Sequence, residues 1–326
     1  MRILITGAAG HIGANLLNRL KNSHEVRGID NFNKYYSPEY KTLRVKSLEV
    51  ENSIQNIDVR NYIELKEVIS DFKPETVIHL AARPGVRARN SELSEYSENN
   101  IQGFLNVIGL SKELKVKKFI YASSSSVYTV DNETPFREDS RLYYPKSYYA
   151  LSKQSNEMAA NYFASDDFNT IGLRFFTVYG PWGRPDMAVL QFLGNALTGQ
   201  NASLNTKLDT LRDFTFVDDV TLLISQVVSH KGLRNSEILN VGGSTPRSLK
   251  ELMSILEDSG LKLNFTQNLQ SNEDIRFTNA SINKIAALGL TVPSMQLEEG
   301  IARTIKWIRS SDTDFINKVI ADAKSK

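Results

Sequence analysis

Apolar runs and amphipathic stretches alternate along the first 175 residues of the chain. The apolar runs predict strands over residues 2–6, 25–29, 54–57, 76–80, 119–122 and 170–173. The amphipathic stretches predict helices over residues 12–21, 62–72, 95–114 and 151–164. Strands and helices that alternate in this way are typical of a parallel sheet with helices on both faces. The pattern therefore predicts an α/β fold built on a doubly wound parallel sheet.

This regular alternation ends near Phe175. The following segment is interrupted by Pro181, Gly183, Pro185 and Gly194. Short helices are expected over residues 188–197 and 249–256, and residues 214–223 and 238–241 are expected to rejoin the main body. We therefore expect one domain over residues 1–175, with a contribution from 214–241, and a smaller, lid-like domain formed mainly by residues 176–326.

Composition narrows the classes of partner. The 39 basic and 37 acidic residues give a net charge of +2, which provides no general attraction for nucleic acid or an anionic membrane. The absence of cysteine excludes disulfides, thiolate metal sites and a cysteine nucleophile, and it fits a reducing compartment. The first residues run directly into a strand, and no apolar run has membrane-spanning length. We therefore expect a cytoplasmic protein with no export signal, no membrane or nucleic-acid partner and no metal.

A glycine-rich loop follows the first predicted strand and opens the first predicted helix. Gly7, Gly10 and Gly13 are its glycines. They permit a tight turn, a close approach of the backbone to phosphate, and close packing of the helix on the strand. Backbone N–H groups at the start of the helix can then hold the pyrophosphate of a dinucleotide. An ordinary glycine-rich turn is the alternative.

Two carboxylates follow the next strands. Asp30 lies 20 residues beyond Gly10 (30 − 10), where it can bind a ribose 2′-hydroxyl. The same carboxylate would repel a 2′-phosphate, so NAD is favoured over NADP. Asp58 follows the third strand and can accept from the adenine amino group. A turn role is the alternative for both residues.

Tyr149 and Lys153 are four residues apart, which places them on one face of a predicted helix. An ammonium beside a phenol favours the phenolate, so the tyrosine can act as a base near neutral pH. The serine run 123–126 begins at the carboxyl end of the fifth strand, where ligands bind in such sheets. A serine there can donate to the oxygen that the tyrosine deprotonates; a polar loop is the alternative. Tyr62 and Lys66 have the same spacing on a predicted surface helix and no expected chemical role.

Further motifs carry a family resemblance. They are residues 31–36 (NFNKYY), 79–82 (HLAA), 84–87 (PGVR), 123–128 (SSSSVY) and 173–187 (LRFFTVYGPWGRPDM). Together with the glycine loop and the Tyr149–Lys153 pair, they resemble the Rossmann-type extended short-chain dehydrogenase/reductases, and most closely the UDP-glucuronate 4-epimerases. The similarity spans most of the chain. Thr129, Ser281 and the run 272–275 depart from the family pattern and leave the nucleotide preference less fixed than the chemistry.

The resemblance implies NAD-dependent 4-epimerisation of a UDP-sugar, with UDP-glucuronate converted to UDP-galacturonate. In that reaction Ser124, Tyr149 and Lys153 are catalytic. Tyr149 takes the 4-hydroxyl proton while hydride passes to NAD, the bound 4-keto sugar turns over, and hydride returns to its opposite face. The expected cofactor-binding residues are Gly7, Gly10, His11, Ile12, Gly13, Asp30, Asn31, Asp58, Leu80, Ala81, Ala82, Asn99, Tyr149 and Lys153. For Asn99, helix capping is the alternative.

A uronic acid needs donors for its carboxylate. Arg184 follows the sixth strand in a loop of glycine and proline and fits this need, although a solvated surface arginine is the alternative. The resemblance places Ser125, Ser126 and Thr177 beside the same carboxylate and Arg212 at the nucleotide diphosphate. Arg87 is expected at the diphosphate or substrate, or as an anchor of its own loop.

Other enzyme classes share parts of this residue pattern. A sugar-nucleotide dehydratase needs an acid pair, and a decarboxylating uronate enzyme a glutamate, where this chain has Ser125 and Ser126. A 4-epimerase of a neutral or N-acetylated UDP-hexose is the main alternative. A catalytically inactive NAD-binding regulator would not need the hydroxyl, tyrosine and lysine together. We also expect a homodimer in which helices 95–114 and 151–164 pair with their copies as a four-helix bundle.

Overall fold

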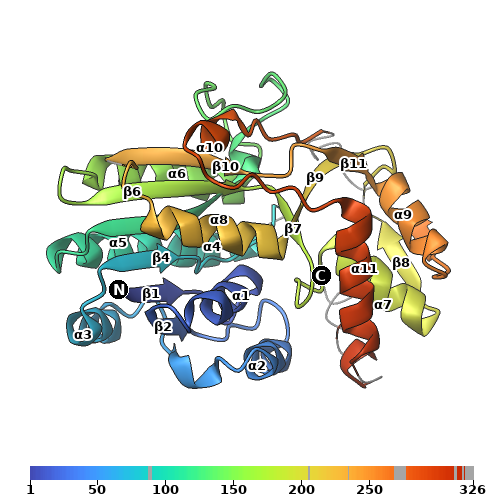
Figure 1. Ribbon diagram of the computed structural model, residues 1–326, viewed down its shortest axis with the longest axis horizontal. Coiled ribbons are helices and arrows are strands. Elements are labelled where there is room, and N and C mark those ends of the chain that lie inside the picture. Colours follow the sequence, from blue (N-terminus) through green and yellow to red (C-terminus); the bar gives the residue numbers. More distant parts are fainter. Residues whose placement is uncertain are drawn as a thin grey trace.

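The computed structural model describes residues 1–86, 90–204, 206–233, 235–267, 277–311, 314–317 and 319. Its largest element is a seven-stranded sheet whose paired strands all run parallel (Figure 1). The strand order is β10 (Ser236–Val241), β6 (Asn169–Phe175), β5 (Lys118–Ser124), β4 (Thr76–His79), β1 (Arg2–Thr6), β2 (Glu25–Asp30) and β3 (Ile54–Asn56). This confirms the predicted doubly wound sheet.

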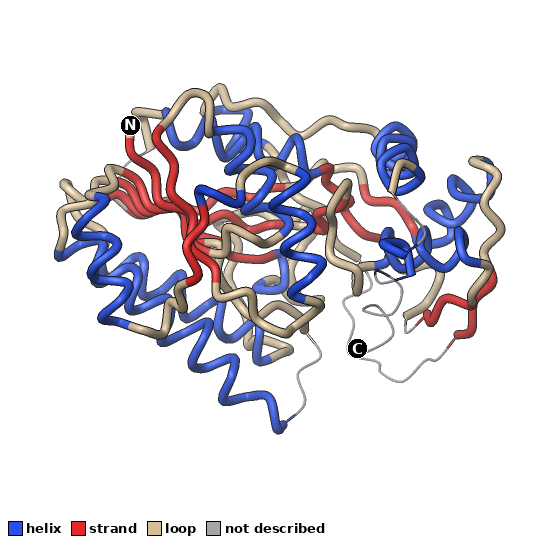
Figure 2. Tube along the Cα trace, turned by 90° about the horizontal axis from the view of Figure 1, so that it is seen from below, coloured by secondary structure: helices blue, strands red, loops and turns tan. Residues whose placement is uncertain are grey.

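Helices cover both faces of this sheet (Figure 2). One face packs on α1 (His11–Leu20) and α8 (Val217–Ser229), and the other on α3 (Tyr62–Phe72), α5 (Gly103–Glu113) and α6 (Tyr148–Phe163). In β1, Ile3 and Ile5 belong to the first layer and Leu4 to the second, because successive side chains of a strand point to opposite faces. Burial on both faces explains the continuous apolar runs of these strands.

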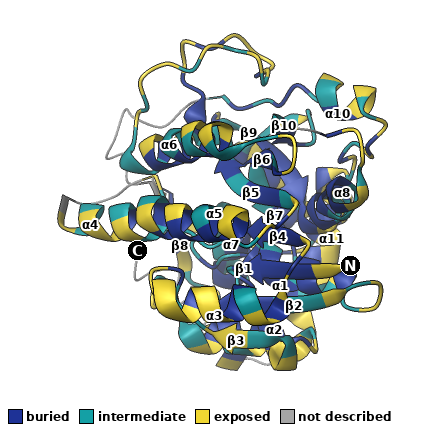
Figure 3. Ribbon diagram, turned by 90° about the vertical axis from the view of Figure 1, so that its left-hand side faces the viewer, coloured by how far each residue is buried: buried dark blue, intermediate teal, exposed yellow. Residues whose placement is uncertain are grey.

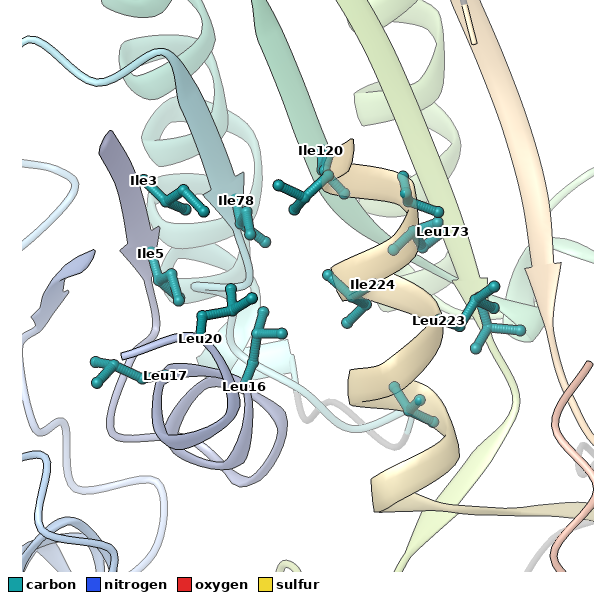
Figure 4. Packing of buried hydrophobic residues seen from close by; sticks show 14 of the residues in the cluster. Ile3, Ile5, Leu16, Leu17, Leu20, Ile78, Ile120, Leu173, Leu223 and Ile224 are labelled. Atoms are coloured by element: carbon teal, nitrogen blue, oxygen red, sulfur yellow. The ribbon is translucent and has the colours of Figure 1, made fainter. Parts of the chain in front are cut away.

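The layer beneath α1 and α8 is a dense aliphatic core. Figure 4 shows Leu16, Leu17 and Leu20 of α1 and Leu223 and Ile224 of α8 directed toward the apolar side chains of the central strands. The expected return of residues 238–241 to the main body is met by β10, which pairs with β6. Residues 214–216 instead belong to β9 (Leu211–Phe216) in a separate sheet.

The predicted helix over residues 95–114 has an irregular first half. It consists of α4 (Leu93–Tyr96), a π-helical turn (Ser97–Gln102) and α5. A π turn adds a residue to the helical turn and rotates the preceding side chains relative to those of α5. The apolar spacing of the sequence could not indicate this insertion, which lies beside the cavity described below.

Most elements after β6, apart from α8 and β10 of the main body, form a smaller body beside the sheet, at the right of Figure 1. A three-stranded sheet joins β11 (Pro246–Ser248), β9 and β7 (Thr177–Tyr179), and β12 (Asn264–Gln267) pairs with β8 (Asn201–Leu204). A second core cluster packs β7, β8 and β9 against α7 (Ala188–Thr198), α9 (Leu249–Asp258) and α11 (Leu297–Arg309). The remaining α-helices are α2 (Pro38–Ser47), after β2, and α10 (Asn283–Ala287).

Within the described ranges, no three side chains of metal-ligating type are gathered in one place. None of the helices in those ranges combines the length and apolar character required to cross a bilayer.

Candidate active site

A cavity of about 700 Å³ lies at the carboxyl ends of β1, β2, β4 and β5. The strand order reverses between β1 and β4, and ligands of open α/β sheets bind at such a reversal. Residues of the smaller body, including Gln191 and Phe192 of α7, close its other side. The cavity is lined by these residues expected from the sequence: Gly7, Gly10, His11, Ile12, Gly13, Asp30, Asn31, Leu80, Ala81, Ala82, Asn99, Ser124, Ser125, Tyr149, Lys153, Thr177 and Arg184.

The glycine loop is too tightly packed for side chains at two of its positions. A Cβ on Gly13 would lie 2.2 Å from the Gly7 carbonyl oxygen, and one on Gly7 would lie 2.7 Å from the Ala81 nitrogen. Gly7 also has a φ of 69°, in the left-handed region. At the start of α1, no side chain of the described residues caps the backbone. The first N–H groups of this helix therefore face the cavity as an anion site.

Asp30 joins the end of β2 to this loop. Its Oδ2 accepts from the Ala9 N–H at 3.0 Å and its Oδ1 from the Phe32 N–H at 2.7 Å. A carboxylate oxygen can accept more than one hydrogen bond, so both retain capacity for ribose hydroxyls. The buried cradle of glycines and this carboxylate fit the pyrophosphate and ribose of NAD.

Asp58 is held away from the cavity. It accepts from Asn31 Nδ2 at 2.9 Å and from Arg60 Nη2 at 2.7 Å. Burial acts to raise the pKa of Asp58, but the hydrogen bonds from Arg60 and Asn31 outweigh it and lower that pKa. Its neighbours Ile57 and Val59 line the cavity, whereas the Asp58 side chain does not. Its predicted bond to adenine stays a prediction.

His11 follows the second glycine and is a neutral, buried side chain. Burial lowers its pKa to about 3, and the charges of Arg44 and Arg184 act in the same direction. Its Nε2 has no hydrogen-bond partner among the described residues. A buried polar atom of this kind at a cavity wall is available to a bound ligand.

The helix α6 brings Tyr149 and Lys153 to the cavity. Ser147 caps it, with Oγ accepting from the Ala150 N–H at 3.1 Å, so the tyrosine lies in the first turn. Lys153 Nζ lies 5.6 Å from the centre of the Tyr149 ring and donates to the Ala122 carbonyl of β5 at 2.9 Å. The predicted pair is therefore in contact with the strand that ends at Ser124.

The serine run turns back beside the tyrosine. Ser124 Oγ accepts from both the backbone N–H and the hydroxyl of Ser126, at 3.2 and 3.0 Å. The hydroxyl of Ser124 lies near enough to Tyr149 to lower the pKa of the phenol. The structure therefore brings Ser124, Tyr149 and Lys153 together, with Ser125 on the cavity wall and Ser126 behind Ser124.

Burial and nearby charges have opposite effects on the pKa of Tyr149. Burial raises the pKa of Tyr149 above its ordinary value, while Arg184 and Ser124 lower it. Burial also lowers the pKa of Lys153 to about 8. Both charged forms are costly in a buried site, so the phenolate depends on cations close to it.

Arg184 reaches the cavity from the loop after β7. Its Nη2 and Nε donate to the two carboxylate oxygens of Asp186, at 2.6 and 3.1 Å, and its guanidinium lies 5.6 Å from the Tyr35 ring centre. Burial acts to lower the pKa of Arg184, but Asp186 and Tyr35 raise it above the ordinary value. No sequence pattern indicated that this guanidinium is already paired with a carboxylate.

The other predicted substrate residues lie in different places. Thr177 of β7 lines the cavity. Arg212 of β9 pairs in register with Arg247 of β11 and donates to the Leu211 carbonyl at 3.1 Å, outside the cavity lining of the described chain. Arg87 lies outside the described residues. Asn99 lies in the π turn, lines the cavity and donates to the Glu95 carbonyl at 2.7 Å.

Several cavity residues were not predicted. Tyr36 and Lys41 come from the polar stretch around α2, and Gln191, Phe192 and Leu249 come from the smaller body. Lys41 is buried, and its Nζ donates to the Asn33 carbonyl at 2.7 Å. These residues have no motif spacing of their own, so the resemblance of residues 31–36 was the only signal near any of them.

Known proteins share this architecture. Protein CapI of Staphylococcus aureus is 36% identical over 329 residues, which cover 94% of this chain and 98% of the relative. The UDP-glucuronate 4-epimerase of Thermodesulfobacterium geofontis is 34% identical over 314 residues, with 94% and 96% covered. The crystal structure of UDP-glucuronic acid 4-epimerase from Bacillus cereus, in complex with UDP-glucuronic acid and NAD, matches with a TM-score of 0.87 and 31% identity over 95% of this chain and 99% of that one.

The family model of the NAD-dependent epimerases and dehydratases matches residues 3–242. That match covers well over half of the 326 residues and includes the glycine loop, Tyr149 and Lys153. It agrees with the resemblance carried by the sequence motifs. The chain therefore belongs to the NAD-dependent epimerase/dehydratase family.

Proposed function

We propose that this chain is an NAD-dependent 4-epimerase of a UDP-sugar and that it interconverts UDP-glucuronate and UDP-galacturonate. The observation that carries the proposal is the meeting of Ser124, Tyr149 and Lys153 in the same cavity as the glycine loop and Asp30. Three of the similar proteins support the substrate: two are named UDP-glucuronate 4-epimerases, from T. geofontis and Arabidopsis thaliana, and the B. cereus structure contains UDP-glucuronic acid.

The cofactor is held by the first domain, which comprises residues 1–175 together with α8 and β10. The N–H groups at the start of α1 bind the pyrophosphate and Asp30 accepts from a ribose. When bound, NAD takes up the C4 hydride of the sugar and returns it to the other face. Residues 176–326 mainly bind the substrate, with Arg87 and Arg212 expected near its diphosphate.

Residues of the chain transfer the proton of the sugar 4-hydroxyl. Tyr149 removes the 4-hydroxyl proton as C4 is oxidised, and it returns the proton to the same oxygen when C4 is reduced. Ser124 donates a hydrogen bond to that oxygen, and Lys153 stabilises the phenolate with its charge. The sugar is oxidised and reduced once in each turnover, so no net oxidation results.

The uronate carboxylate is assigned to Arg184, Ser125, Ser126 and Thr177. A single charge-assisted hydrogen bond is worth about 1.5–3 kcal/mol. Replacement of Arg184 by Leu should therefore lower kcat/KM for UDP-glucuronate by roughly 10- to 100-fold relative to UDP-glucose. Arg137→Leu is the matched control, because Arg137 forms an exposed pair with Asp139.

One observation favours the neutral-sugar alternative. Asp186 already neutralises Arg184, so a uronate must share this guanidinium with a carboxylate. Turnover of UDP-glucuronate, UDP-glucose and UDP-N-acetylglucosamine by the purified protein, followed by product chromatography, decides between them. We expect a clear preference for UDP-glucuronate; a preference for either neutral sugar would overturn the assignment.

We also propose a cytoplasmic homodimer. The absence of cysteine fits a reducing compartment. The helices α5 and α6 lie side by side on an outer surface (Figure 3) and present Leu105, Leu151, Met158 and Tyr162 as exposed apolar side chains. Met158 is 74% and Tyr162 83% exposed, as expected of a face that a second copy covers. Light scattering should give a dimer for the wild type and a monomer for Met158→Asp; a monomeric wild type at micromolar concentration refutes the proposal.

A further inference from the structure

Glu157 extends the row of Tyr149 and Lys153 along α6. The three residues follow one another at intervals of four, which stacks them on one face of the helix. Glu157 therefore lies one turn beyond Lys153, on the side away from the phenol. It is buried and lies outside the cavity lining, so it cannot touch the substrate directly.

The carboxylate of Glu157 is firmly anchored. Arg174 of β6 donates to both of its oxygens, from Nε at 2.9 Å and from Nη2 at 2.8 Å. Ser123 of β5 donates to the same carboxylate at 2.5 Å. Arg174 in turn donates to the Tyr128 hydroxyl at 2.7 Å. A buried carboxylate with three donors keeps one position, and its bond to Ser123 fixes the strand end that carries Ser124.

Apart from Glu157, the side chains packed around Lys153 do not stabilise its positive charge. From β4, His79 is a neutral imidazole, because burial and the charge of Lys153 lower its pKa to about 3. From β5, Tyr121 has a raised pKa, first through burial and then through Glu157. From β6, Arg174 adds a second cation. Among these described neighbours Glu157 carries the negative charge, and it acts against the burial that lowers the pKa of Lys153.

We infer that Glu157 is a positioning residue for the proposed epimerisation, holding the Lys153 ammonium charged beside Tyr149 while fixing the end of β5 through Ser123. The inference rests on the proposed function. Replacement of Glu157 by Gln removes the negative charge and leaves Arg174 as an unpaired cation near Lys153. The ammonium then loses its proton at a lower pH, and with it the phenolate loses its support.

The direct test measures the titration of Lys153 in the NAD-loaded protein. Protein labelled with [ε-¹³C]lysine gives an NMR signal for Lys153, which Lys153→Met assigns. We expect the Lys153 midpoint to fall by roughly one pH unit or more in Glu157→Gln, because this variant removes an opposite charge one helical turn from the ammonium. In the double variant Glu157→Gln/Arg174→Met, which removes both charges of the pair, the midpoint should return toward that of the wild type. Glu113→Gln, which removes an exposed partner of Lys66, should leave it unchanged.

The same variants also yield pH profiles of kcat/KM. The alkaline limb should move to lower pH in Glu157→Gln and move back in the double variant. If Glu157→Gln does not fold, Glu157→Asp and the double variant carry the comparison. An unmoved Lys153 midpoint in folded variants overturns the inference, even if kcat falls. A wild type that turns over no UDP-sugar overturns the proposed function instead, since the NMR titration needs no turnover.

Discussion

Lys153 should destabilise the folded protein at neutral pH, and its replacement by Met should therefore stabilise it. Burial lowers the pKa of this lysine from its ordinary 10.5 to about 8, and the side chain is only 2% exposed. That difference corresponds to about 3 kcal/mol of cost for holding the charge in the folded state. The variant also loses the hydrogen bond to the Ala122 carbonyl, which lowers its free energy of unfolding by about 1 kcal/mol. The expected net gain in the free energy of unfolding is about 2 kcal/mol.

The sign of the pH dependence follows from proton binding. Between pH 8 and 10.5 the unfolded chain holds the Lys153 proton and the folded chain has lost it, so the wild type gains stability as pH rises through this window. The advantage of Lys153→Met is therefore full below pH 8 and disappears toward pH 10.5. At about 2 °C per kcal/mol for a chain of this size, the variant should melt about 4 °C higher at pH 7.

Differential scanning fluorimetry at pH 7 and 9.5, with saturating NAD, measures this gap in melting temperature between Lys153→Met and the wild type. The comparison between the two pH values cancels losses that do not depend on charge. Lys66→Met is the matched control, because Lys66 is exposed on α3 and its gap should be small at both pH values. A Lys153→Met variant that melts below the wild type by the same amount at both pH values would show that burial of this charge costs nothing.

Three further changes test the remaining parts of the account. Gly13→Ala places a Cβ 2.2 Å from the Gly7 carbonyl oxygen. It should weaken NAD binding in a fluorescence titration and lower turnover roughly 10²-fold. Gly109→Ala is the control and should bind NAD normally, because its Cβ would meet nothing within 4 Å. Tyr149→Phe should lower turnover roughly 10²- to 10⁴-fold while NAD binding persists, and normal turnover would remove the proposed base. Ser248→Ala breaks the capping box of α9 and should lower the free energy of unfolding in urea by about 1 kcal/mol; an unchanged value would show that the cap contributes nothing.

The central sheet was predictable because its inner strands, such as β1, β4 and β6, are buried on both faces. Ile3, Leu4 and Ile5 form a continuous apolar run for that reason, and this pattern recurs along the first domain. The ends of the strands were harder to predict. The strand β5 was expected to stop at residue 122 but continues through Ser123 and Ser124, which pair with Arg174 and Phe175. Polar residues can extend a strand when a neighbouring strand supplies the hydrogen bonds.

Charged residues buried by distant partners escaped prediction. Arg44 lies in the polar stretch of α2, yet it is fully buried and donates to the carbonyls of Ala9 and Trp182 at 2.6 and 2.9 Å. Its partners are 35 and 138 residues away, so no local pattern reveals them. The Arg184–Asp186 pair escaped notice for another reason, since two neighbouring charges in a loop look equally well solvated.

Position in the fold separated the two tyrosine–lysine pairs. Tyr62 and Lys66 share the spacing of Tyr149 and Lys153, but both contact Glu113 on an exposed surface. Tyr149 and Lys153 were distinguished by the serine run at the end of β5. Spacing alone identifies a helix face, and the edge of the sheet identifies which face meets a ligand.

The central claim is that C4 of the sugar loses and regains the same hydrogen while Tyr149 handles only the hydroxyl proton. Incubation of the protein with UDP-[4-²H]glucuronate in ordinary water, followed by NMR of the product, tests it directly. We expect UDP-galacturonate that retains deuterium at C4. A UDP-galacturonate that carries solvent hydrogen at C4 would contradict the account.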